Sequence, residues 1–126
     1  MPKARDLQQP SPWIVRFSGL ISTPGPVLDL AAGKGRHTRY FRRLGFDVTA
    51  IDRDISALKS LGDAPDVEII EADLEGGATW PLGPRRFKGI VVANYLHRPL
   101  FPHILDALTD DGVLIYETFA AGNENY

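Results

Sequence analysis

The sequence predicts an α/β domain in which helices flank a doubly wound, mostly parallel sheet of about five strands. Two observations support this fold class. Short apolar segments bounded by turn residues recur along the chain, and amphipathic helical segments separate several of them. Parallel strands need crossover connections, which are nearly always right-handed and place helices on the sheet faces. Because 126 residues suit one domain, we take residues 1–126 as a single unit.

The stretch from Val27 to Asp52 contains the clearest strand-helix-strand unit. Val27–Leu30 is short and mostly apolar, as expected of a strand buried on both faces of a parallel sheet. The following helix is predicted from one apolar stripe with spacing i, i+3, i+4 and i+7, formed by His37, Tyr40, Phe41 and Leu44. Gly45 ends this helix, and Val48–Ile51 forms the next strand, which brings Asp52 to its carboxyl end.

A further helix is predicted before this unit. Residues 1–10 are largely polar and are expected to be mobile. Ser11 and Pro12 then suit the cap and first turn of a helix. Its apolar residues are Trp13, Ile14, Phe17, Leu20 and Ile21. We expect this helix to cover the sheet, and the alternative is a lid over a substrate.

Three more strands are predicted after Asp52. A short helix capped by Asp54 precedes them, and the strands are Val67–Ile70, Ile90–Ala93 and Val113–Tyr116. A loop rich in Gly and Pro joins the first two, and a helix from about Pro99 to Leu108 joins the last two. The carboxyl ends of parallel strands meet at one edge, so six residues are expected to converge there: Asp29, Gly33, Gly35, Asp52, Asp73 and Asn94.

Composition limits the classes of function. The chain has no cysteine, which excludes disulfides, thiolate metal sites and cysteine nucleophiles, and we expect no metal. A net charge of −2 gives no reason to expect nucleic acid or an acidic membrane as a partner. The N-terminal residues include no apolar run long enough for a signal peptide or a membrane span, so a cytoplasmic protein is the default expectation.

The charge at the predicted edge favours a cationic ligand over a phosphate-bearing one. A dinucleotide-binding turn reads Gly-x-Gly-x-x-Gly, whereas the turn from Gly33 to Thr38 lacks the last glycine. Asp29 adds negative charge where a pyrophosphate would have to lie. A compound with a sulfonium and an ammonium, such as S-adenosylmethionine, suits three nearby carboxylates better.

The first unit resembles the nucleotide-binding half of the class I S-adenosylmethionine-dependent methyltransferases, especially the small ones related to tellurite-resistance methyltransferases. In that family the first strand and turn read acidic-x-Gly-x-Gly-x-Gly, and an acidic residue ends the second strand. The matching positions are Asp29, Ala31, Gly33, Gly35 and Asp52, where Ala31 is a small departure from glycine. The resemblance continues to about residue 119 and implies a Rossmann-like fold with S-adenosylmethionine as cofactor.

The resemblance also implies roles for individual residues. Asp52 would accept hydrogen bonds from the ribose hydroxyls, and Asp73 with Leu74 would bind adenine. Asp29 would meet the methionine ammonium or, alternatively, cap nearby loop N–H groups. The other residues expected at the cofactor are Ala31, Gly33, Gly35, Arg53 and Asn94, while Lys34 and Arg36 either approach the methionine carboxylate or are solvated.

Catalytic residues are harder to assign. If the reaction needs a base, His97 is the first candidate because imidazole titrates near neutral pH, and Tyr95 is the second. Family members that methylate amino groups of DNA or of protein glutamine commonly carry Asn/Asp-Pro-Pro-Tyr/Phe after the fourth strand, and Asn94 begins no such segment here. Those acceptors are therefore disfavoured, and a small-molecule substrate is expected.

The expected function is thus methyl transfer from S-adenosylmethionine to a small molecule. The alternatives are a non-catalytic S-adenosylmethionine-binding remnant or partner subunit, and an NAD(P)-binding domain. The family usually has about seven strands, so we expect this chain to lack the usual C-terminal strand pair and to be truncated after the fifth strand. An apolar edge over residues 113–119 would then favour a homo-oligomer through this strand.

Overall fold

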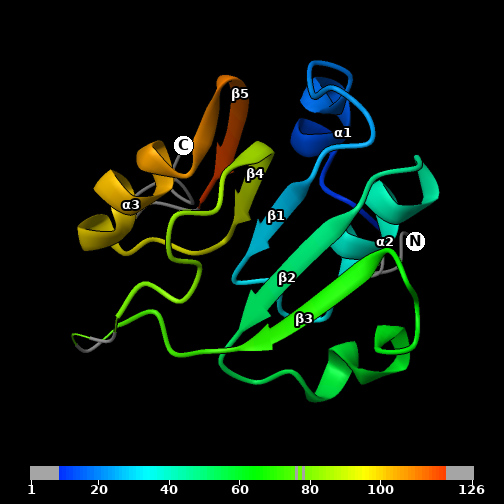
Figure 1. Cartoon of the computed structure of the whole chain (residues 1–126). Helices are drawn as coiled ribbons and strands as arrows, with labels where there is room; N and C mark the ends of the chain where they lie inside the picture. Colours follow the sequence, from blue (N-terminus) through cyan, green and yellow to red (C-terminus); the bar gives the residue numbers. More distant parts are fainter. Residues whose placement is uncertain (1–8, 76, 78, 119–126) are drawn as a thin grey trace, which may run out of the picture.

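The computed structural model of the chain describes residues 9–75, 77 and 79–118. Within them, one sheet of five parallel strands has the order β3-β2-β1-β4-β5 (Figure 1). The strands are β1 (Val27–Leu30), β2 (Val48–Asp52), β3 (Val67–Glu71), β4 (Phe87–Ala93) and β5 (Leu108–Glu117). The predicted fold class is confirmed. The mobility expected for residues 1–10 concerns mainly residues outside the described ones.

Helices cover both faces of this sheet. The elements are α1 (Pro12–Ser18), α2 (Arg36–Arg43), the 3-10 helix η1 (Ser56–Leu61), the 3-10 turn η2 (Arg98–Leu100) and α3 (Phe101–Asp106). Helices α1 and α2 pack on one face, where Ile14 and Phe41 meet Val27, Val48 and Val91. Helix α3 packs on the other face through Ile104. No helix in the described part of the chain is long and apolar enough to span a membrane.

Strand β1 lies at the centre of the sheet and is buried along its whole length. It pairs with β2 on one side and with β4 on the other, and all four of its residues are buried. This explains why the strand is apolar except at Asp29, since both of its faces are covered. The carboxyl ends of β1, β2, β3 and β4 meet at one edge of the sheet, as their parallel pairing requires.

Two predicted helical stripes are wrong at their ends. Helix α1 stops at Ser18, with Gly19 as its C-cap, so Leu20 lies beyond the helix and is 64% exposed. Trp13 is also exposed, while Ile21 is buried after the helix has ended. Leu44 was expected on the core face of α2, but it is the C-cap residue and is 46% exposed. In both cases the helix ends before its periodic pattern does.

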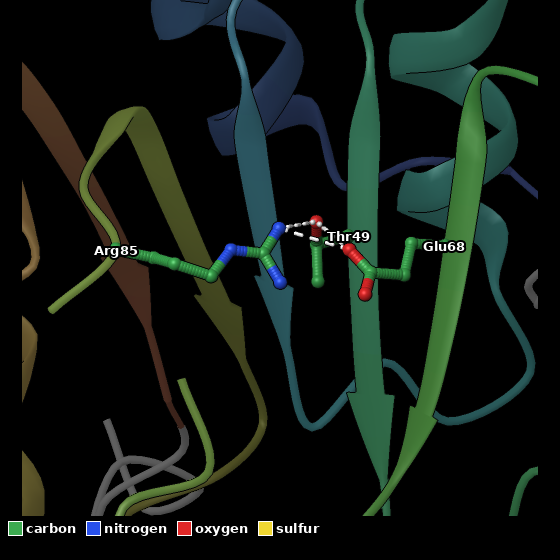
Figure 2. Close-up of polar contacts among 3 residues, drawn as sticks. All are labelled: Thr49, Glu68 and Arg85. Atoms are coloured by element: carbon green, nitrogen blue, oxygen red, sulfur yellow. Dashed lines mark hydrogen bonds and ion pairs between the residues drawn. The ribbon is translucent and has the colours of Figure 1, made fainter. Parts of the chain in front are cut away.

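The connection from β3 to β4 sends one long side chain across a face of the sheet. The described residues of this connection, 72–75, 77 and 79–86, contain turns and no helix. Figure 2 shows Arg85 extending from the segment before β4 across β1 toward Thr49 on β2 and Glu68 on β3. Its Nη2 donates to Thr49 Oγ1 at 3.1 Å and to Glu68 Oε1 at 2.9 Å. The arginine stem therefore shields the sheet face while its guanidinium satisfies the buried Thr49 hydroxyl.

We expect the stem of Arg85 to stabilise the fold more than its charge does. The Glu68 side chain is 52% exposed, so the ion pair contributes at most about 1 kcal/mol. The substitution Arg85→Met keeps most of the stem and should lower the free energy of unfolding by less than about 1 kcal/mol. Arg85→Ala should cost clearly more in urea denaturation. Equal losses in the two variants would show that the charge dominates.

Candidate functional site

Two adjoining cavities open at the carboxyl edge of the sheet. The β2–β3 cavity, of about 370 Å³, is lined by Ala31, Asp52, Arg53, Ala72, Asp73, Leu74, Glu75 and Tyr95. The β1–β4 cavity, of about 350 Å³, is lined by Asp29, Ala31, Ala32, Gly33, Lys34, Arg36, His37, Asp52, Ala93, Asn94 and Tyr95. The two share Ala31, Asp52 and Tyr95, so one elongated ligand can occupy both.

This arrangement places most of the predicted site residues together. Asp29, Gly33 and Asn94 lie in the β1–β4 cavity, and Asp73, Leu74 and Arg53 lie in the β2–β3 cavity. Gly35 lines neither of them. Instead, a Cβ at Gly35 would come within 2.7 Å of Leu58 Cδ2, so this glycine allows the turn to pack against η1.

Asp29 is a carboxylate buried in the central strand. It is 3% exposed, and its Oδ2 accepts a hydrogen bond of 2.6 Å from Thr38 Oγ1. This hydrogen bond joins Asp29 in the central strand to the first turn of α2. Burial raises the pKa of Asp29 to about 6, because the hydrogen bonds from Thr38 only partly offset the loss of water. The two roles expected for Asp29, at the ligand ammonium or as a cap for loop N–H groups, both stay predictions.

The turn between β1 and α2 depends on left-handed backbone conformations. Gly33 has φ of 59°, and no atom lies within 4 Å of the place where its Cβ would be, so it leaves open space. Ala31 has φ of 60°, a conformation that costs an L-residue roughly 1–2 kcal/mol. The departure from glycine at Ala31 thus matters for backbone conformation, and the small size of alanine does not remove that cost.

Asp52 connects the turn after β1 to the end of β2. Its Oδ1 accepts from Gly33 N at 3.3 Å, and its Oδ2 accepts from Asp54 N at 3.1 Å. Each carboxylate oxygen has a further lone pair, so Asp52 can also accept hydrogen bonds from ligand hydroxyls. Asp73 is held in a similar way, because its Oδ1 accepts from Glu75 N at 3.0 Å. Both carboxylates are therefore oriented by backbone N–H groups, which for Asp52 come from its own loop and from the turn after β1.

Of the two candidate bases, Tyr95 lies in the site and His97 lies beside it. The Tyr95 hydroxyl donates to Glu75 Oε2 at 3.0 Å, and burial together with Glu75 raises its pKa well above the usual range. Tyr95 is therefore set up as a hydrogen-bond donor. His97 lines a separate cavity of about 180 Å³ with Trp80, whose ring stacks on His103. The catalytic roles of both residues stay predictions.

Three residues of the site were not singled out from the sequence as ligand-binding groups. In the sequence, Thr38 was mentioned only because it stands where a dinucleotide-binding turn would have its last glycine. In the structure, its hydroxyl donates a hydrogen bond to Asp29. His37 was assigned to the core stripe; it is indeed buried, but it also lines the β1–β4 cavity. Glu75 lines the β2–β3 cavity and accepts a hydrogen bond from the Tyr95 hydroxyl. A signal existed only for His37, since a polar ring in an apolar stripe at a helix start is unusual.

The buried carboxyl of Asp29 should make the protein less stable at neutral pH. Its pKa is about 6 in the folded state against 3.8 ordinarily, so its contribution to stability falls as pH rises through this interval. Asp29→Asn keeps an oxygen that can accept from Thr38 and removes the buried charge. We expect its free energy of unfolding to exceed that of the unaltered protein by up to roughly 3 kcal/mol at pH 7.5.

The advantage of Asp29→Asn should vanish near about pH 4, where Asp29 is already protonated in the folded protein. Urea denaturation of both proteins at the two pH values measures this difference. Other titrating groups are common to both proteins and cancel in the comparison. An asparagine variant that is less stable at both pH values would contradict the assigned cost of the buried charge.

Comparison with known proteins gives one family and a set of solved structures. The family model of the tellurite resistance protein TehB matches residues 15–76. No curated protein matches the sequence. The glycopeptide N-methyltransferase MtfA, complexed with sinefungin, is 27% identical, with a TM-score of 0.63 over 90% of this chain and 57% of its own.

Two further structures show the same fold at lower identity. A TehB-like S-adenosylmethionine-dependent methyltransferase from Corynebacterium glutamicum is 22% identical, with a TM-score of 0.63 over 81% of this chain and 60% of its own. Coclaurine N-methyltransferase is 21% identical, with a TM-score of 0.62 over 81% of this chain and 32% of its own. The chain thus spans about a third to three fifths of these proteins. The predicted resemblance is confirmed: the chain has the fold of the class I S-adenosylmethionine-dependent methyltransferases and is similar to TehB.

Proposed function

We propose that the chain binds S-adenosylmethionine across its two adjoining cavities and transfers the methyl group to a small molecule. The observation that carries this proposal is the position of Asp52 in the shared wall, with Asp29 in one cavity and Asp73 in the other. Carboxylates along both cavities suit a ligand with two cationic groups. MtfA structures with S-adenosylmethionine and with S-adenosylhomocysteine support the same choice.

The lining residues fit the parts of this cofactor. In the β2–β3 cavity, Asp52 would accept from the ribose hydroxyls, and Asp73 with Leu74 would bind adenine. In the β1–β4 cavity, Asp29 would face the ammonium, and the open space at Gly33 would let the ligand approach the backbone. The bound cofactor would supply a methyl group on a sulfonium for direct displacement. The protein's part would then be to orient the acceptor and exclude water.

An NAD(P)-binding function has less support. A pyrophosphate next to the start of α2 would lie in a cavity that also contains Asp29 and Asp52. The carboxylate charge of Asp52 would oppose it at that position. Fluorescence titration with NADH tests this alternative directly, and saturable binding would favour it over the proposed cofactor.

A non-catalytic cofactor-binding module is the second candidate. It is favoured by the position of His97, which lines a separate cavity and neither part of the proposed site. Calorimetry with S-adenosylmethionine, followed by a methyl-donor consumption assay on a metabolite library rich in amines, separates the two. Binding with turnover supports the enzyme, and binding without turnover supports the module.

The substitution Asp52→Ala should weaken S-adenosylhomocysteine binding about tenfold or more in calorimetry, because ligand hydroxyls lose their acceptor. Asp63→Ala is a matched control. It removes the same charge from an exposed residue before β3, which places it at the opposite edge of the sheet. Unchanged affinity in Asp52→Ala, or equal losses in both variants, would remove Asp52 from the site.

We also propose that the chain self-associates through β5. This strand is at the edge of the sheet, so its outer N–H and C=O groups face no described strand. Apolar hollows flank it on both sides, one with Phe101 and Leu105, the other with Trp13 and Leu20. A second copy fits because an antiparallel pair of β5 strands would bring identical apolar hollows together around a two-fold axis.

Sedimentation velocity tests this association. The unaltered protein should form a concentration-dependent dimer. Leu105→Glu and Leu20→Glu should shift it toward monomer, since these side chains are 62% and 64% exposed beside β5 and should tolerate substitution without loss of fold. Leu44→Glu, at the end of α2, serves as control for a new surface charge. A monomer at all concentrations would overturn the proposal.

A further inference from the structure

The two ring nitrogens of His37 have different surroundings. The backbone N–H of Ser11 donates to Nε2 at 3.0 Å. Burial, with a further contribution from Arg36, lowers the pKa of His37 to about 4, so the ring is neutral near pH 7. A neutral imidazole carries one proton, and a nitrogen that accepts a hydrogen bond does not hold it. The proton of His37 is therefore on Nδ1.

This Nδ1–H group is free to meet a ligand. No described residue accepts a hydrogen bond from Nδ1. No fully buried side-chain nitrogen or oxygen among the described residues lacks a partner. Nδ1 is therefore accessible, even though His37 as a whole is only 4% exposed. His37 lines the β1–β4 cavity, so this cavity is the described open space next to its ring.

The charges in this cavity indicate which ligand group would accept the hydrogen bond. Lys34 and Arg36 line it together with His37, and Asp29 lines it from β1. Cationic groups and a neutral donor suit a carboxylate, and Asp29 suits an ammonium. The cavity thus offers complementary groups to both ends of an amino acid.

We propose that His37 Nδ1–H donates a hydrogen bond to the carboxylate of the amino-acid end of a bound S-adenosyl ligand, beside Lys34 and Arg36. This inference rests on the proposed function and adds a specific binding residue to it. Through the same ring, Ser11 fixes the orientation of the donor, because the hydrogen bond at Nε2 prevents the imidazole from turning over. The orientation of the donor is thus set by a contact within the protein.

Two substitutions separate the roles of the two nitrogens. Asn has its amide nitrogen where His has Nδ1, so His37→Asn keeps the ligand donor and loses the acceptor for Ser11. Gln reaches the position of Nε2 with its amide oxygen, so His37→Gln keeps the contact with Ser11 and loses the donor. The probes are S-adenosylhomocysteine and its decarboxylated form, which lacks only the carboxylate. Calorimetry measures affinity, and thermal unfolding measures stability.

We expect His37→Gln to weaken S-adenosylhomocysteine binding about tenfold while the affinity for the decarboxylated form stays unchanged. His37→Asn should retain more of the affinity for S-adenosylhomocysteine than His37→Gln does, but unfold at a lower temperature than the unaltered protein. The reverse pattern, in which only His37→Asn loses affinity and does so for both compounds, would overturn the inference in favour of a purely structural role. If the unaltered protein binds neither compound, the proposed function itself fails and the inference fails with it.

Discussion

A hydrogen bond between Thr38 and Asp29 joins the centre of the sheet to the start of α2, and the geometry of the candidate site depends on it. The bond is 2.6 Å long, and both residues are buried. Since Asp29 lies in the central strand and Thr38 in the first helical turn, their contact determines the path of the turn between them. That turn contributes Ala31 and Gly33 to the cavities. The buried carboxyl of Asp29 thus costs stability at a position that lines the β1–β4 cavity.

Ser11 provides a second constraint, which links distant parts of the chain. Its hydroxyl accepts from Trp13 N at the start of α1 and donates to Glu117 Oε1, at the end of β5, at 2.5 Å. Its backbone N–H holds His37 at the start of α2. Glu117 O in turn accepts from Asn94 N after β4. Ser11 thus ties together α1, β5 and α2, and of the residues it holds His37 lines the β1–β4 cavity.

The fold could be predicted from the sequence because its signals are local. The apolar strands, the cap formed by Ser11 and the stop at Gly45 each act over a few residues, and parallel pairing then brings the strand ends together. The ends of helices were less predictable. Leu20 and Leu44 continue an apolar period, but each lies beyond the last helical residue, where the chain changes direction and exposes the side chain.

Contacts that join residues far apart in sequence, on the sheet face and in the site, could not be predicted in the same way. Arg85 meets Glu68 across two intervening strands, and Tyr95 meets Glu75 across the gap between the ends of β3 and β4. Both contacts depend on the path of the connection between these strands, which has turns in place of a helix and no periodic pattern to reveal it. The positions of Asp29 and Asp52 were predictable because each lies within a short strand that the local sequence pattern already defines.

The sharing of three residues by the two cavities constrains recognition. Any ligand that occupies both cavities must pass Ala31, Asp52 and Tyr95. Each of these residues is held in place in a different way. Asp52 is oriented by two backbone N–H groups, and Ala31 is part of a turn in a left-handed conformation. Tyr95 is held by Glu75 through its hydroxyl and by Tyr116 through its backbone carbonyl. Contacts within the protein therefore hold all three residues at the passage between the cavities, which reduces the entropy that an elongated ligand would lose in ordering them.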